Sequence, residues 1–111
     1  MNPEDRIRIQ HMLDAAQEAC EFMGDASFED FKNNRLLANG LVRSIEVIGE
    51  AASQVSSEFR ASHGKIPWRD IISMRNRLVH AYFDVDYSVV WRTVKDDLPQ
   101  FIKQLKEILK P

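Results

Sequence analysis

Hydrophobic residues recur every three or four positions along almost the whole of this 111-residue chain. Such spacing places apolar side chains on one face of an α-helix, whereas the side chains of a strand alternate with a period of two. Three stripes follow it: Ile9, Leu13, Ala16, Cys20 and Met23; Leu37, Leu41, Ser44, Ile48, Ala51 and Val55; and Val90, Val94, Leu98, Phe101, Leu105 and Ile108. The pattern therefore predicts an all-α protein without strands.

Residues with special backbone preferences mark the ends of the first helices. Gly24 can adopt the left-handed conformation that closes a helix, and Ser27 can cap a short helical turn over residues 28–31. Gly40 and Gly49 lower the helix propensity of the second long helix. We therefore expect another helix to pack closely against these glycines.

Similar signals divide the second half of the chain. The segment 61–67 is rich in turn formers and ends on a proline, so it predicts a loop followed by a third helix over Trp68–His80. Asp86 can cap the last helix, and Pro99 predicts a kink near Asp97. The expected fold is one domain over residues 1–111, an up-and-down bundle of four long helices with a fifth short helix at 28–31.

Composition limits the class of protein. The chain has 15 basic and 17 acidic residues, so RNA or DNA could be held only by a local basic patch. Its single cysteine, Cys20, cannot form an internal disulfide, which is typical of a reducing cytoplasm. No segment has the apolar length of a signal peptide core or a membrane span. We expect a cytoplasmic protein that, because it is small, forms an oligomer.

The segment 74–82 is unusual because two arginines, an amide, an imidazole and a phenol lie close together in it. On a continuous helix Asn76 and His80 would share a face, whereas Arg75 would lie about 140° around the axis from His80. A single helix would not aim both groups at one small ligand. Either the long arginine side chain reaches over, or a two-fold dimer brings Arg75 and His80 of both chains into one cleft.

These side chains suit RNA cleavage without a metal. Histidine can accept and donate a proton near neutral pH, and a guanidinium matches phosphate oxygens with its forked donors. The alternative interpretation is structural: a histidine late in a helix can stabilise the helix dipole, and arginines commonly form surface salt bridges.

The order of these residues resembles a known motif. Arg75-Asn76-x-x-x-His80 is similar to the RNxxxH motif of the HEPN ribonuclease superfamily, and with Tyr82 it resembles the RxxxxHxY motif of HepT toxins from HepT–MntA toxin–antitoxin pairs. Further segments that resemble this family are 43–52, 66–72, 83–86, 90–94 and 97–99. The resemblance therefore covers nearly the whole chain.

The resemblance implies a HEPN-like homodimeric endoribonuclease that needs no metal or other cofactor and has its active cleft at the dimer interface. Arg75 and His80 would be catalytic, and Asn76 would orient the imidazole or the phosphate. Tyr82 matches the tyrosine to which the family's partner, an MntA-like nucleotidyltransferase antitoxin, adds AMP. An anionic adenylyl group two residues from His80 would block the cleft and repel RNA.

Each of the other candidate site residues can be interpreted as functional or as structural. Glu46 could line the cleft and orient Arg75 or His80, but its spacing favours an ion pair with Arg43. The basic residues Lys32, Arg35, Arg69 and Arg77 could form a rim that binds RNA, or could be ordinary solvated charges. The histidines and Cys20 lack a metal-ligand spacing, so no metal site is expected.

Three functions are compatible with these features of the sequence. The leading one is a ribonuclease toxin of a type VII-like toxin–antitoxin system, neutralised by adenylylation of Tyr82. The alternative is a non-catalytic HEPN module that binds a nucleotide or docks a nucleotidyltransferase partner. A purely structural dimerisation bundle would explain the apolar stripes but not the clustering of Arg75, Asn76, His80 and Tyr82.

Overall fold

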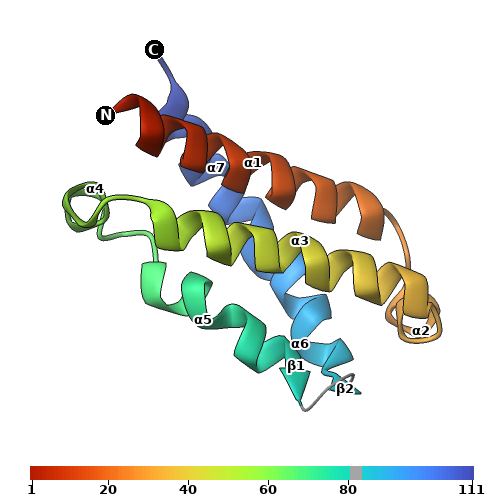
Figure 1. Ribbon diagram of the computed structural model, residues 1–111. Helices are drawn as coiled ribbons and strands as arrows, with labels where there is room; N and C mark the ends of the chain where they lie inside the picture. Colours follow the sequence, from red (N-terminus) through yellow and green to blue (C-terminus); the bar gives the residue numbers. More distant parts are fainter. Residues whose placement is uncertain (81–83) are drawn as a thin grey trace.

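Two long antiparallel helices, α1 (Pro3–Met23) and α3 (Arg35–Gln54), form the centre of the computed structural model, which describes residues 1–80 and 84–111. The short helix α2 (Phe28–Lys32) lies at the turn between them (Figure 1). Their predicted stripes supply much of the core, including the buried residues Ile9, Leu13, Ala16, Met23, Leu41, Ile48 and Ala51. The apolar periodicity therefore predicted the central pair correctly.

The remaining helices pack on this pair. Helix α5 (Trp68–Leu78) lies against α3, and α7 (Leu98–Leu109) lies against α1. Helix α6 (Tyr87–Arg92) and the π-helical turn η1 (Thr93–Asp97) lead directly into α7, so the three form one long rod behind the central pair (Figure 1). The predicted all-α, up-and-down bundle of four long helical rods is confirmed, and α2 is the expected short fifth helix.

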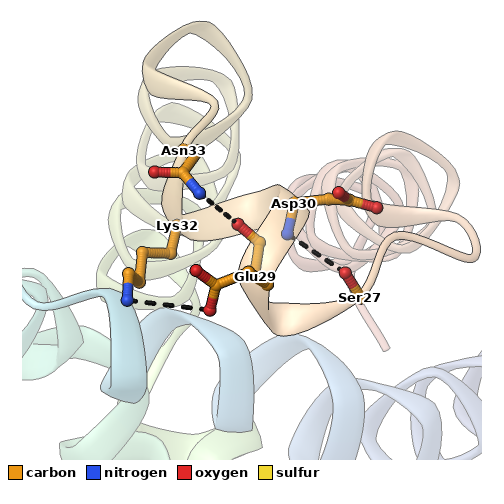
Figure 2. Close-up of polar contacts among 5 residues, drawn as sticks. All are labelled: Ser27, Glu29, Asp30, Lys32 and Asn33. Carbon is orange, nitrogen blue, oxygen red and sulfur yellow. Dashed lines mark hydrogen bonds and ion pairs between the residues drawn. The ribbon is translucent and has the colours of Figure 1, made fainter.

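Three of the predicted helix ends are present. Gly24 closes α1 with a φ of 50°, in the left-handed region. The Ser27 hydroxyl accepts a hydrogen bond from the Asp30 amide at 3.1 Å at the start of α2 (Figure 2). The Asp86 carboxylate accepts one from the Val89 amide at 3.1 Å at the start of α6.

The irregularity expected near Asp97 takes the form of the π-helical turn η1. Pro99 has no amide hydrogen, and its ring would clash with the carbonyl four residues earlier in a regular helix. The Leu98 amide donates to the Thr93 carbonyl, five residues back, which widens the turn before the proline. The helix is therefore locally widened instead of broken.

The predictions of a loop over 61–67 and of a chain without strands were wrong. The expected loop over 61–67 begins later, because the short helix α4 (Ser57–Ser62) extends into it. The Ser56 hydroxyl caps this helix by accepting a hydrogen bond from the Phe59 amide. The expected absence of strands was also wrong. The strands β1 (Val79–His80) and β2 (Asp84–Val85) pair in antiparallel register after α5. None of the described helices is long and apolar enough to cross a membrane.

Candidate active site

The end of α5 differs from the sequence prediction. The third helix was expected to continue to His80, but it ends at Leu78, and Val79 is already extended. Val79 pairs with Val85, His80 pairs with Asp84, and the Asp86 amide donates to the Leu78 carbonyl at 2.7 Å. β-branched residues favour extended backbone, so the two valines stabilise this pairing. Asn76 and His80 therefore do not share a helix face.

Arg75 forms an ion pair with Glu46 across the contact between α5 and α3. The Arg75 Nε atom lies 3.4 Å from a carboxylate oxygen of Glu46. Glu46 therefore pairs with Arg75, and the local pair with Arg43 that the spacing favoured is not the contact observed. Because Nε faces Glu46, the two terminal Nη groups are the atoms that Arg75 can offer to a ligand.

Gly49 allows α3 and α5 to approach closely enough for this pair. A Cβ atom on Gly49 would lie 3.0 Å from the Ile71 carbonyl oxygen and 3.4 Å from that of Ile72. These are backbone atoms of α5, so they could not move aside independently of the helix. The expectation that a helix packs closely on this glycine is confirmed at Gly49.

Two hollows, each of about 240 Å³, adjoin the ion pair and share Glu46 and Arg75. The first lies along the contact between α3 and α5, and its lining includes Gly49, Glu50 and Ile72. The second, which we call the Arg75 hollow, is lined by Arg35, Asn39, Val42, Glu46, Arg75, Val79, Val85 and Tyr87. The side chain of Arg75 is 57% exposed, so a ligand in either hollow can reach it.

The other residues of the motif surround the same end of α5. Asn76 follows Arg75 in the last turn and is exposed. His80 lies in β1, directly after Val79, which lines the Arg75 hollow. Tyr82 lies outside the described residues. The backbone therefore places the strand that carries His80 at the edge of the hollow that contains Arg75.

The four candidate rim residues do not form one patch. Arg35 lines the Arg75 hollow, whereas Arg69 lines a different hollow at the beginning of α5. Arg77 lies in a third, where it donates to the Asp70 carbonyl oxygen at 3.4 Å. Lys32 pairs with Glu29 at 3.7 Å within α2 (Figure 2). Of the four, only Arg35 shares a hollow with the ion pair.

Sequence reasoning missed two polar residues of the Arg75 hollow. Asn39 lies on α3 between Arg35 and Glu46, and the spacing of four and seven residues places all three on one helix face. The sequence could therefore have indicated Asn39, because this polar stripe is visible in the spacing of the residues. Tyr87 comes from α6, and its ring packs on Phe31 with centroids 5.2 Å apart. No local pattern indicates that contact.

Comparison with known proteins supports the resemblance that the sequence showed. The family model described as "Ribonuclease HepT-like" matches residues 12–108, which include α5 and the whole motif. This chain belongs to the HepT-like ribonuclease family. Membership confirms the resemblance found in the sequence, the HEPN-like bundle and the expected enzyme class, an endoribonuclease.

Relatives in the HepT-like family extend over almost the whole chain. "Putative RNase TTE0752" of Caldanaerobacter subterraneus is 41% identical over 105 residues, covering 95% of this chain and 94% of its own length. "Putative RNase MJ1380" of Methanocaldococcus jannaschii is 34% identical over 98 residues (88% and 90%). "Probable ribonuclease HepT" of Thermococcus cleftensis is 35% identical over 102 residues (92% and 93%). No solved structure matches the chain significantly.

Proposed function

We propose that this HepT-like protein is a metal-independent endoribonuclease toxin of a type VII-like toxin–antitoxin system, acting through Arg75 and His80 in a homodimer cleft. The observation that carries the proposal is the Glu46–Arg75 ion pair, which orients an exposed guanidinium beside the strand that bears His80. Among residues 1–80 and 84–111, no group of three or more His, Cys, Asp or Glu is placed to hold a metal ion. The chemistry that we propose uses the side chains of Arg75 and His80, which the sequence motif indicates.

In the proposed reaction the ribose 2′-hydroxyl attacks the adjacent phosphorus. The O2′–P bond forms and the P–O5′ bond breaks, which leaves a 2′,3′-cyclic phosphate and a 5′-hydroxyl. His80 moves protons, since one leaves the 2′-oxygen and one must reach the departing 5′-oxygen. The Nη groups of Arg75 stabilise the charge that develops on the phosphoryl oxygens. Asn76 orients the imidazole or the phosphate.

We further propose that the cleft forms between two copies of the chain. Arg75 is more than half exposed, and its hollow is bordered on one side by the β1–β2 hairpin. A second copy would enclose the phosphate and bring its own Arg75 and His80 to the same cleft. Enclosure strengthens electrostatic stabilisation because it removes water from the reacting groups.

Regulation by a nucleotidyltransferase is the third part of the proposal. An MntA-like antitoxin would transfer AMP from ATP to the hydroxyl of Tyr82, two residues beyond His80, with release of pyrophosphate. The adenylyl group adds bulk and negative charge, and both would oppose RNA in the cleft. The support here is the sequence motif, since Tyr82 lies outside the described residues.

The first experiment compares the wild type with His80→Ala on total cellular RNA in the presence of EDTA. We expect cleavage by the wild type only. His11→Ala is the matched control, because His11 is exposed on α1 and should leave cleavage unchanged. Circular dichroism checks that all three proteins are equally helical. An inactive wild type whose intact mass shows no added AMP would contradict the toxin and favour the non-catalytic docking module.

Glu46 is proposed as a positioning residue that acts through Arg75. Glu46→Gln should lower kcat by about 10- to 100-fold, since a misplaced guanidinium stabilises the transition state less well. Thermal stability should change by less than about 1 kcal/mol, because the ion pair is partly exposed. Combining Glu46→Gln with Arg75→Ala should cost no more activity than Arg75→Ala alone. Full additivity would show that Glu46 acts independently of Arg75.

A further inference from the structure

The hollow that Arg69 lines also contains a second arginine, and it lies near the beginning of α5, at the other end of the helix from Arg75. It has a volume of about 530 Å³, and its lining includes Ser57 and Arg60 of α4 and Trp68, Arg69 and Ser73 of α5. None of its lining residues is acidic. We call it the Arg60–Arg69 hollow. Two guanidinium groups and two hydroxyls give it hydrogen-bond donors without a compensating negative charge.

Both arginines lack a charged partner in the part of the chain that the structure describes. Arg69 is exposed and makes no ion pair with any described residue. The Nε atom of Arg60 is buried, yet it has no hydrogen-bond partner among the described residues. A buried donor without an acceptor is unfavourable, because it has lost its hydrogen bonds to water without replacing them. An anion in this hollow would balance two guanidinium charges that no carboxylate of the described residues pairs with.

The Arg60–Arg69 hollow adjoins the candidate active site, since the two share a lining residue. Ile72 lines it and also lines the hollow along α3 and α5 that contains Glu46 and Arg75. Arg69 and Arg75 are six residues apart on α5, which corresponds to roughly 9 Å along the helix axis. The two residues also lie about 120° apart around the axis, so a polyanion that contacts both sites must curve around α5.

We propose that the Arg60–Arg69 hollow is a second phosphate-binding subsite, which holds the backbone of the RNA strand whose reacting phosphate lies at Arg75. This inference rests on the proposed ribonuclease function. The arginines lie on α4 and α5, whereas Glu50, which also lines the connecting hollow, lies on α3. The strand therefore follows the α5 side, where it avoids the Glu50 carboxylate. Arginine suits this role because its forked donors match phosphate oxygens.

The test measures binding of a 2′-O-methyl RNA of about 12 nucleotides, a length within the range of single-strand sites. Its methylated 2′-oxygen cannot attack, so the native protein binds it without cleavage. We expect Arg60→Gln/Arg69→Gln to raise Kd by about tenfold, the effect of losing charge-assisted contacts. The slope of log affinity against log salt should become shallower by about 1.4, as expected when two phosphate contacts are lost.

Lys103→Gln/Lys106→Gln is the matched control, because it removes two exposed positive charges from α7, away from this hollow. It should leave Kd and the salt slope nearly unchanged. If the Arg60 variant fails to fold, Arg69→Gln alone tests the proposal, because Arg69 is exposed. A dinucleotide, too short to span both sites, should bind both double variants equally.

Two results would overturn the proposal. One is equal RNA affinity for the arginine and lysine variants. The other is unchanged RNA affinity together with weaker self-association in sedimentation, which would assign the hollow to contact with a second copy. Cleavage of unmodified RNA by the wild type is measured separately. If that cleavage is absent while binding depends on Arg60 and Arg69, the ribonuclease proposal fails and the phosphate subsite stands.

Discussion

At the scale of single residues, Asp5 shows how one buried carboxylate can join distant segments. It lies in the first turn of α1 and is 4% exposed. It accepts hydrogen bonds from the Ser56 amide at 2.8 Å and the Ser56 hydroxyl at 2.6 Å, at the junction between α3 and α4. The hydrogen bonds from Ser56 lower the pKa of the Asp5 carboxyl, because they favour its charged form.

Asp5→Asn should destabilise the fold by about 2 kcal/mol at neutral pH, since the amide cannot accept both bonds equally well. A lowered pKa in the folded state means that the stabilisation is complete above the usual carboxyl pKa. It is lost as the pH falls through the folded-state value. Chemical denaturation at several pH values measures this difference. The exposed Asp25→Asn is the control, and a gap between wild type and Asp5→Asn that widens with acid would contradict the account.

At the scale of helices, the crossing of α3 and α5 decides where Arg75 lies. Gly49 and Gly40 both lie in α3, but their surroundings differ. A Cβ on Gly49 would press on the α5 backbone at 3.0 Å, whereas one on Gly40 would meet the Phe22 ring at an ordinary 3.7 Å. The two glycines therefore provide a matched pair of substitutions in one helix.

Gly40→Ala should stabilise the protein by about 0.5–1 kcal/mol, because alanine has the higher helix propensity. Gly49→Ala gains the same helix propensity, but it should lower stability by about 1–3 kcal/mol, because the added Cβ would force α5 to shift away from α3. It should also reduce RNA cleavage, since the shift separates Arg75 from Glu46. Thermal unfolding and a cleavage assay measure both effects. Equal stabilisation by the two alanines would show that the crossing is not tightly packed.

At the scale of the whole molecule, the proposed cleft requires two chains. Arg75→Ala and His80→Ala proteins should each retain only a small residual activity. The shared cleft of a wild-type dimer would contain two pairs of Arg75 and His80, and a mixed dimer would keep one intact pair, with Arg75 from one chain and His80 from the other. If half of the dimers are mixed, about a quarter of the wild-type activity should return. Native mass spectrometry confirms that mixed dimers form, and inactive mixed dimers would contradict a cleft shared between the chains.

The sequence by itself determined the features that depend on neighbours along the chain. The apolar stripes predicted the helices, because a helix repeats every 3.6 residues wherever it lies. Local hydrogen bonds made the caps at Ser27 and Asp86 predictable, and the missing amide of Pro99 indicated the irregularity before α7. The order of residues in the motif indicated the HepT-like family.

Only the tertiary structure decided the contacts between distant segments. Glu46 pairs with Arg75 of another helix instead of Arg43 because the close approach at Gly49 brings α5 alongside it. Helix α5 stops at Leu78 because the pairing of β1 with β2 replaces its last helical turn. The sequence did not indicate Arg60 as a binding residue, because it did not predict the helix α4 that carries it. Such contacts depend on packing between residues that are far apart in the chain, and this packing outweighs local propensity. They follow no periodic pattern in the sequence, so the sequence alone does not predict them.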